Sequence, residues 1–297
     1  MSAVLSIDAG QSGIRLRLGE EQLPELPGVR TDLQVLPQLA DAARQAAGAG
    51  LTHVAIGSTG LRNSDTAASL LEMVTDLGIK QVAVAHDSIT SYLGALGSSR
   101  GAIVASGTGV VALAVGKTSV ARVDGWGNIL SDAGSGYWIG RSGLEAVMRA
   151  HDGRGPATAL TEVVKEEFPD LESAYIDIQN DPARVRRVAS YSKTVAGLGP
   201  SDEVCASIIK EAANQLAHST MTALRRVGED QADKTLVSVQ GKVFQDQPLR
   251  QRFNQLILEA APGAKIVSPQ GDGLDGVGWL FKLPENSPLR AHVSYAG

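Results

Sequence analysis

Apolar runs alternate with amphipathic segments through the first hundred residues of the chain. VLSIDAGQSGIRLRL, residues 4–18, reads as an apolar run, a carboxylate, a glycine-bracketed polar turn and a second, alternating run, which predicts two strands. The segments that follow are a helical pattern at 33–47, an apolar run at 53–57, a capped helical pattern at 65–78, an apolar run at 81–85 and a helix from Asp87 to about Leu96. This order predicts a sheet with helices packed on it.

The opening pattern returns in outline at GAIVASGTGVVALAV, residues 101–115, and residues 119–123 can supply a further strand. A helix-rich region then begins, and late strands are expected on either side of another helix. The predicted helix starts are Pro156, Asp181-Pro182 and Ser201, the last helix running to about Val227, and the predicted late strands are 235–241 and 264–269. A short helix at 273–283 is followed by a tail that we expect to be loose.

The length of 297 residues is about twice that of a typical domain and favours two domains. LGSSRG around residues 98–100 is a small polar linker. We therefore expect an N-terminal domain at 1–98 and a C-terminal domain at 99–272. The terminal helix and tail, 273–297, could pack back on the first domain.

Composition narrows the class of protein. The formal net charge of -5 gives no electrostatic reason to expect nucleic acid as a partner. No apolar stretch reaches the roughly 18 residues that a membrane helix needs, and MSAVLSIDAG lacks the pattern of a secretory signal, so we expect a soluble, cytoplasmic protein. The single cysteine, Cys205, excludes an intramolecular disulfide or a four-thiolate metal site, and we expect it to be a packing residue.

Two glycine turns bring backbone N–H groups to a surface without obstruction by Cβ atoms, as a phosphate requires. In the first, residues 8–13, Asp8 could hold Mg²⁺ through water. The alternative is a hairpin turn in which Asp and Gly serve the backbone alone. The second, Ser106–Gly109, leads into a strand rather than a helix, so it is not a dinucleotide fingerprint. Gly116-Lys117-Thr118 lacks the first glycine of a P-loop, since Val111 stands there.

Carboxylates and aromatic residues mark two further candidates. Asp87, between QVAVAH and a helix, could accept a proton from a substrate hydroxyl or could simply cap the helix. His86 beside it is expected to be structural. GWGNILSDAGSGYWIG, residues 125–140, combines aromatic side chains, glycines and one Asp, which favours a sugar pocket over a plain glycine-rich connection. The glycine turns at 240–243 and 271–278 could admit a flat ring, although each signal is weak alone.

Taken together, DAGQSG, SGTG, GWGNILSDAGSGYWIGRSGLEAV and the Gly-Lys-Val-Phe turn resemble the BadF/BadG/BcrA/BcrD ATPase family, and within it the N-acetylglucosamine kinase branch. The resemblance covers nearly the whole chain and is most specific at residues 125–140. It implies the α/β fold of sugar kinases, actin and the heat-shock chaperone ATPases, with two ribonuclease-H-like domains, an α-rich second domain and ATP in the cleft between them.

The resemblance also implies roles for single residues. Asp87 would be the catalytic carboxylate, and Asp8 would lie on the Mg²⁺ side of the first phosphate motif. Phosphate binding is implied for Gly10, Gln11, Ser12, Ser106, Gly107, Thr108 and Gly109. Adenosine binding is implied for Gly241, Lys242, Val243 and Gly276, and sugar binding for Asp32, Thr59, Asp87, Trp126, Asp132 and Gly136. Residues 141–150 would form a helix behind the sugar pocket.

Two departures from the family fall on sugar recognition and leave ATP chemistry intact. The kinases carry a GPxN turn whose Asn contacts the sugar, whereas LPGVRTD places Thr31 or Asp32 in that region. Val110-Val111 also replace polar residues. Asp32 would suit a cationic amino group better than an acetamide.

We therefore expect a homodimeric enzyme that uses ATP and Mg²⁺ to phosphorylate a primary hydroxyl of an amino sugar, N-acetylglucosamine or glucosamine, giving the 6-phosphate. One alternative is an ATPase activator of a 2-hydroxyacyl-CoA dehydratase, which needs cysteines to ligate an iron–sulfur cluster. Another is a non-enzymatic sugar or nucleotide sensor that closes without phosphoryl transfer. The ROK sugar kinases match less well, because the chain has no Cys-rich zinc motif.

Overall fold

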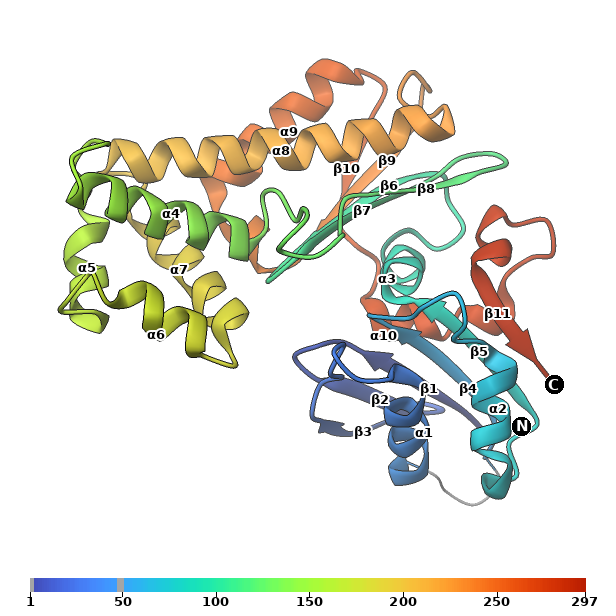
Figure 1. The fold of residues 1–297 in the computed structure, drawn as a ribbon. Helices are drawn as coiled ribbons and strands as arrows, with labels where there is room; N and C mark the ends of the chain where they lie inside the picture. Colours follow the sequence, from blue (N-terminus) through green and yellow to red (C-terminus); the bar gives the residue numbers. More distant parts are fainter. Residues whose placement is uncertain (1–2, 47–50) are drawn as a thin grey trace. The chain divides into compact units, whose positions relative to one another are not determined.

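The structure, a computed structural model, describes residues 3–46 and 51–297. The chain forms two compact units (Figure 1). The first unit comprises Met1–Ile103, Leu113–Val120 and Val267–Gly297, and the second comprises Val104–Ala112 and Ala121–Ile266. The chain thus passes between the units more than once, which the sequence-based division at residues 98 and 272 did not include.

A six-stranded sheet in the order β11-β5-β4-β1-β2-β3 forms the centre of the first unit within the described residues. β1, β4 and β5 are parallel neighbours, while β2, β3 and β11 join it by antiparallel pairing. The strands are β1 (Ala3–Ala9), β2 (Ile14–Leu18), β3 (Glu21–Leu26), β4 (Leu51–Ser58), β5 (Gln81–His86) and β11 (Val293–Ala296).

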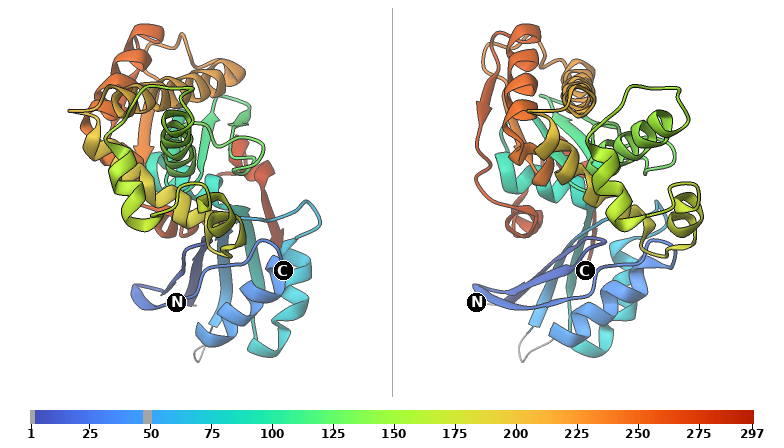
Figure 2. Two further views of the ribbon diagram at one scale, coloured as in Figure 1. Left: turned by 60° about the vertical axis from the view of Figure 1, so that its left-hand side comes forward. Right: turned by 90° about the vertical axis from the view of Figure 1, so that its left-hand side faces the viewer.

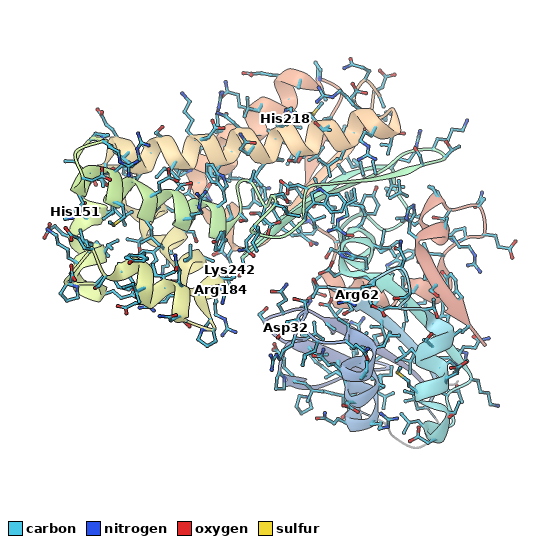
Figure 3. The ribbon with its side chains drawn as sticks, in the orientation of Figure 1. Asp32, Arg62, His151, Arg184, His218 and Lys242 are labelled. Atoms are coloured by element: carbon cyan, nitrogen blue, oxygen red, sulfur yellow. The ribbon has the colours of Figure 1, made fainter. Side chains whose placement is uncertain are left out.

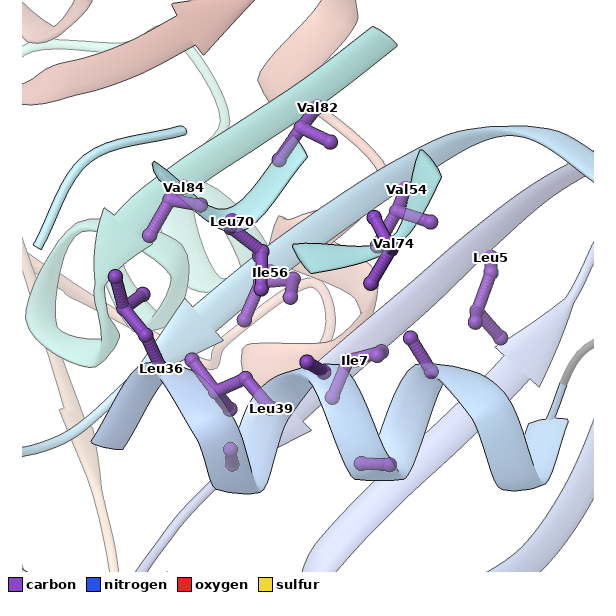
Figure 4. Close-up of a cluster of buried hydrophobic side chains, with 14 of the residues drawn as sticks. Leu5, Ile7, Leu36, Leu39, Val54, Ile56, Leu70, Val74, Val82 and Val84 are labelled. Atoms are coloured by element: carbon purple, nitrogen blue, oxygen red, sulfur yellow. The ribbon is translucent and has the colours of Figure 1, made fainter. Parts of the chain in front are cut away.

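Helices cover both faces of this sheet. α1 (Val35–Ala46) and α2 (Ala67–Met73) pack on one face, where Leu36, Leu39 and Leu70 meet buried residues of β1, β4 and β5 (Figure 4). α3 (Asp87–Leu96) and α10 (Gly273–Val277) pack on each other and against β1 and β4 (Figures 1 and 2). Short 3-10 turns complete the unit at η1 (Thr75–Leu77), η3 (Leu280–Lys282) and η4 (Pro288–His292).

The second sheet has the strand order β10-β9-β6-β7-β8 within the described residues. The four limits between the units fall inside its strands β6, β7, β8 and β10. Its strands are β6 (Gly101–Ser106), β7 (Val110–Val115), β8 (Val120–Val123), β9 (Leu236–Gln240) and β10 (Lys265–Val267). α8 runs beside α9 in every view (Figures 1 and 2). The remaining elements are α4 (Gly136–His151), α5 (Leu160–Glu167), α6 (Ala174–Asn180), α7 (Arg184–Leu198), α8 (Glu203–Val227), η2 (Lys242–Gln245) and α9 (Gln247–Ala260).

The predicted α/β fold class with two sheets is confirmed, and so are most long elements. The helix predicted at 33–47 is observed as α1, and residue 47 lies outside the described residues. α4 includes the helix expected at 141–150, and α8 ends at Val227 as expected.

Several local predictions were wrong. The helix expected at 65–78 begins after its N-cap Thr66, ends at Met73 and continues as a 3-10 turn. No helix begins at Pro156, since α5 starts at Leu160. The tail expected to be loose forms β11, whose backbone pairs with β5. β3 and α6 were missed because their few apolar residues give no clear period.

Candidate functional site

The carboxyl edge of the first sheet brings together three residues predicted from the sequence. β1, β4 and β5 lie side by side, with Asp8 opposite Gly57 and Ser58 opposite His86. Because parallel strands end at the same edge, Asp8, Thr59 and Asp87 follow one another along it. The Thr59 N–H donates to the Ala9 carbonyl at 3.0 Å, which ties β4 to β1 at this edge.

The first glycine turn is a closed hairpin with exposed donors at its tip. The Gly10 N–H donates to the Gly13 carbonyl at 3.0 Å, and the side chains of Gln11 and Ser12 are exposed. A Cβ atom on Gly28 would lie 2.2 Å from the Gln11 carbonyl oxygen, so only glycine permits the next loop to approach the turn this closely. That loop carries Thr31 and Asp32 to the same edge.

Asp8 is a half-buried carboxylate paired with Arg15, a residue that the sequence did not single out. The Arg15 guanidinium donates to Asp8 Oδ2 and to Asp272 Oδ2, and thus joins β1, β2 and the turn before α10. Burial raises the pKa of Asp8 despite the opposing effect of Arg15, and the charges of Asp87 and Asp272 add to the rise. Two carboxylates therefore share one guanidinium, and Asp87 acts on Asp8 through its charge.

The residues present fit a magnesium ion held through water. Both Arg15 contacts use Asp8 Oδ2, so Asp8 Oδ1 has no hydrogen bond within the described part of the chain. Mg²⁺ prefers one or two carboxylates and keeps much of its water, which suits one available oxygen. No group of three or more His, Cys, Asp or Glu side chains among the described residues is arranged as a direct metal cage.

Asp87 is the first residue of α3 and not its cap. His86 is the N-cap, and its Nδ1 accepts a hydrogen bond from the Ser88 N–H at 3.2 Å. The prediction that His86 has a structural role therefore agrees with the capping contact, whereas the capping alternative for Asp87 is wrong. The Asp87 carboxylate lies with Oδ1 2.7 Å from His86 Nδ1 and is about one-third exposed.

Asp32, a predicted sugar ligand, is already paired within its own loop. Arg30 Nη2 donates to Asp32 Oδ2 at 2.7 Å, and both side chains are largely exposed (Figure 3). The hydrogen bond from Arg30 lowers the pKa of Asp32. The pair is nevertheless a surface ion pair, which contributes little to stability and can open when a ligand competes.

In the second unit, the second glycine turn meets the predicted adenosine turn. A Cβ atom on Gly241, whose φ is +95°, would lie 2.1 Å from the Ser106 carbonyl oxygen, so the two turns touch through their backbones. The Gly136 N–H donates to the Gly107 carbonyl at 2.7 Å, which attaches the start of α4 to the same turn. Thr108 and Lys242 have exposed side chains, Lys242 as labelled in Figure 3.

Asp132 is a buried carboxylate beside this turn. Its carboxylate lies against Gly109, where a Cβ atom would approach Oδ2 to 2.9 Å. Burial and the charge of Asp124 raise the pKa of Asp132, while backbone N–H groups of Val110 and Gly127 stabilise its ionised form. Its φ of +65° is in the left-handed region, which a non-glycine residue rarely adopts outside functional loops.

The loop before Asp132 is held by its own hydrogen bonds and exposes apolar side chains. Asp124 Oδ1 accepts from the N–H groups of Gly125 and Asp132 at 2.7 and 2.8 Å. Trp126 is 58% exposed, and the Arg122 guanidinium lies 4.7 Å from the centre of its ring. One face of the indole is thus occupied by a cation.

Other predicted or notable residues have structural explanations. Gly276 is buried in the first unit, and a Cβ atom there would lie 1.7 Å from the Thr90 carbonyl oxygen, so close packing alone accounts for the glycine. Cys205 is fully buried, and burial raises the pKa of its thiol to about 11. A cavity of about 840 Å³ in the second unit is lined by Trp138, Glu145, Arg149 and residues of α8, and it contains no predicted site residue. No helix within residues 3–46 and 51–297 is both long and apolar enough to cross a bilayer.

Comparison with known proteins agrees with this arrangement. The BadF/BadG/BcrA/BcrD ATPase family matches residues 1–277, which include both glycine turns, Asp87 and the loop of Asp132. The chain belongs to this family. Like the predicted resemblance, the match extends over nearly the whole chain.

Two curated relatives of this chain are sugar kinases. An N-acetyl-D-glucosamine kinase of Dictyostelium discoideum is 28% identical over 238 residues, covering 76% of this chain and 74% of the relative. An N-acetylmuramic acid/N-acetylglucosamine kinase of Clostridium acetobutylicum is 26% identical over 228 residues, covering 75% and 74% of the two chains. A crystal structure from Chromobacterium violaceum, provisionally assigned as an N-acetylglucosamine kinase, shares the fold with a TM-score of 0.69 and 23% identity, covering 94% of this chain and 99% of its own.

Sequence reasoning missed Arg15, Asp124 and Asp272. Asp272 stands 257 residues from Arg15 along the chain, so no local pattern connects the two. Arg15 alternates with buried Ile14 and Leu16 on β2, which does indicate the face of the strand opposite the core. Arg15 lies opposite Asp8 in the pairing of β2 with β1, and this cross-strand pair was the signal that could have identified Arg15.

Proposed function

We propose that the chain is an ATP-dependent kinase that phosphorylates an amino sugar. The observation that supports this proposal most is the edge of the first sheet, where Asp8, Thr59 and Asp87 end three adjacent parallel strands. Phosphoryl transfer needs a phosphate cradle, a cation-side carboxylate and a base close to one another. The family match and the two curated kinases agree with the same reaction.

In the proposed reaction each glycine turn offers backbone N–H groups to phosphate oxygens. Asp87 accepts the proton of the sugar hydroxyl as its oxygen bonds to the γ-phosphorus. The bond between the γ-phosphorus and the bridging oxygen breaks, and ADP leaves with the electron pair. Arg15 donates to Asp8 Oδ2, which favours the ionised carboxylate against the effect of burial and ties Asp8 to β2.

Asp8 and its water shell would hold Mg²⁺, which supplies positive charge to the phosphates when it is bound. Asp272 accepts a hydrogen bond from the same guanidinium, so it helps to hold Arg15 in position beside Asp8.

For the acceptor, we propose N-acetylglucosamine ahead of glucosamine, with transfer to the 6-hydroxyl. Within the second unit, Asp132 would accept hydrogen bonds from sugar hydroxyls, and the face of Trp126 away from Arg122 would contact the ring. Asp32 is paired with Arg30 in a surface ion pair that a ligand can open, so this residue does not decide between the two sugars. The names of both curated relatives include N-acetylglucosamine.

The test of the base is Asp87→Asn, which keeps the size of the side chain and removes proton acceptance. We expect kcat to fall by about 100-fold or more, in keeping with general base catalysis, while ATP binding measured by calorimetry persists. Asp76→Asn on the exposed η1 turn is the matched control and should keep wild-type turnover. Near-normal turnover of Asp87→Asn would remove Asp87 from the mechanism.

The acceptor is tested by coupled ADP release across N-acetylglucosamine, glucosamine, N-acetylmuramic acid, N-acetylmannosamine and glucose, with the phosphorylated position assigned by NMR. The expected result is the highest kcat/KM for N-acetylglucosamine. Failure of every sugar to stimulate ADP release would instead support the sensor. A dehydratase activator is disfavoured, because the buried, weakly acidic thiol of Cys205 is a poor cluster ligand.

A further inference from the structure

Two of the contacts made by the His86 imidazole cannot both be satisfied by one protonation state. The Ser88 N–H donates to His86 Nδ1 at 3.2 Å, which requires a lone pair on that nitrogen. Asp87 Oδ1 lies 2.7 Å from the same nitrogen, a distance that calls for a proton between the two atoms. The Ser88 hydroxyl, 3.0 Å away, can act as donor or acceptor in either state.

The two contacts therefore correspond to two states of the His86–Asp87 pair. Without an added proton, Nδ1 accepts from the Ser88 N–H, and the neutral ring carries its hydrogen on Nε2. With one added proton, that proton lies between His86 Nδ1 and Asp87 Oδ1. The Ser88 hydroxyl then rotates and gives up its hydrogen bond to Nδ1. Ser88 is only 2% exposed, so the backbone around this exchange is held in place.

The strand and helix fix the pair in this position. His86 ends β5 and caps α3, and Asp87 begins the helix, so both side chains leave the backbone at the carboxyl edge of the sheet. The side chains of His86 and Asp87 are 26% and 32% exposed, which leaves each within reach of solvent. A proton held by the pair can thus reach bulk water through either residue.

We propose that His86 is a positioning residue for Asp87 that orients its carboxylate and shares the proton taken from the acceptor hydroxyl. The inference rests on the proposed function, because it takes Asp87 as the base. As the sugar oxygen bonds to phosphorus, its hydrogen passes to Asp87. The new O–H bond of Asp87 then donates its proton to His86 Nδ1, which restores the carboxylate, and the imidazolium releases the proton to water.

Other charged groups surround the pair and act on every step. Asp8 on β1 interacts electrostatically with Asp87, and Arg15 on β2 and Asp272 before α10 act through Asp8. The two additional carboxylates place negative charge near the pair. Removing His86 leaves these three groups unchanged.

The test compares His86→Asn with the wild type in kcat, in the KM values for ATP and sugar, and in the pH dependence of kcat/KM. The Asn side chain can still accept from the Ser88 N–H and so keep the cap, but it cannot take a proton. We expect kcat to fall about 10- to 100-fold, as for other residues that orient a ligand or a catalytic group. The KM for ATP should stay unchanged. We also expect the acid limb of the profile to move to lower pH, because the pair is reduced to a single carboxylate.

His53→Asn is the matched control, since His53 lies on the neighbouring strand and bonds Thr52 rather than a carboxylate. It should keep the wild-type profile. If His86→Asn loses the fold, as judged by its Tm, His86→Gln with the same measurements replaces it. In His86→Ala, added imidazole should restore kcat without changing the KM for ATP.

Wild-type kcat and an unmoved acid limb in a folded His86→Asn or His86→Gln protein would overturn the inference and leave the proposed kinase intact, provided that Asp87→Asn is inactive. An active Asp87→Asn protein would overturn both. Loss of kcat in His86→Asn without any movement of the acid limb would also reject proton sharing, because a purely structural role predicts that result.

Discussion

Asp132 is a candidate site residue whose charged form lowers the stability of the folded protein. Its carboxylate is 6% exposed, two backbone N–H groups point at it, and its own backbone is in the left-handed region. Burial raises its pKa even so, which means that the folded protein holds the charged form less well than water does. Its charged form therefore does not stabilise the fold, which is in keeping with the proposed role in sugar binding.

The pH dependence of stability follows from this direction. Because the folded pKa of Asp132 lies above its unfolded value near 3.8, its favourable contribution is complete below that value and is lost as pH rises through the folded pKa. Asp132→Asn should therefore gain stability relative to wild type as the pH rises above 3.8, because the Asn side chain has no charged form to bury. Thermal unfolding across this range measures the effect, with Asp76→Asn as control, and a difference in Tm that does not grow with pH would contradict it.

At the residue scale, the sequence identified groups whose chemistry is readable in one stretch. Asp87 after a strand and Asp132 in a glycine-rich loop stood out, and the structure gives both carboxylates positions that suit the predicted roles. Arg15 and Asp272 did not stand out, because an arginine on a strand and an aspartate before a short helix are ordinary until the fold brings them together. The charge state of Asp8 depends on that pair and so could not be predicted.

At the scale of elements, α3 and α10 meet through glycine. A Cβ atom on Gly94 would lie 1.8 Å from the Asp272 carbonyl oxygen, and one on Gly276 would lie 1.7 Å from that of Thr90. The Gln270 N–H donates to the Ala95 carbonyl at 3.0 Å beside this crossing. The helix that begins at Asp87 is thus fixed by backbone contact with the helix that begins after Asp272.

Gly276→Ala tests this crossing. The added methyl group meets main-chain atoms that cannot move aside, so we expect a loss of about 1–3 kcal/mol in the free energy of unfolding and a lower kcat through displacement of Asp87. Gly278→Ala is the nearby control, because its φ of -60° is helical and its Cβ atom would be 3.2 Å from its nearest neighbour. Urea unfolding gives both values, and equal stability of the two variants would show that the helices do not need the close approach.

The elements with a sustained period were predicted well, and those set by distant partners were not. α1 and α8 carry apolar residues at helical spacing over many turns, and both were found. β11 has four residues and owes its conformation to pairing with β5, more than two hundred positions earlier. A short segment of this kind has no signal of its own.

At the scale of the whole molecule, the first unit is assembled from three separate stretches of chain. β11 covers the outer edge of β5, with Val293 opposite Ala85 and Ala296 opposite Val82. The Tyr295 hydroxyl donates to the Leu280 carbonyl at 2.8 Å and adds a side-chain contact. The strand that ends in His86 is therefore an interior strand of its sheet only because the last strand is present.

Deletion of residues 293–297 should expose the edge of β5. We expect a Tm lower by about 5 °C or more, faster hydrogen exchange of the β5 amides and a tendency to self-associate through the free edge. Tyr295→Phe, which keeps the strand and loses one hydrogen bond, is the control and should remain monodisperse to the same degree as wild type. Unchanged exchange of Val82 and Val84 amides after the deletion would show that β11 is dispensable.

The position of β11 also sets an order of events during synthesis. A ribosome adds residues from the N-terminus, so β5 leaves the exit tunnel long before its partner strand has been translated. While the second unit is being made, the edge of β5 stays open, and His86 and Asp87 sit at the end of an unprotected strand. The proposed base can acquire its final surroundings only after β11 has been translated and has paired with β5.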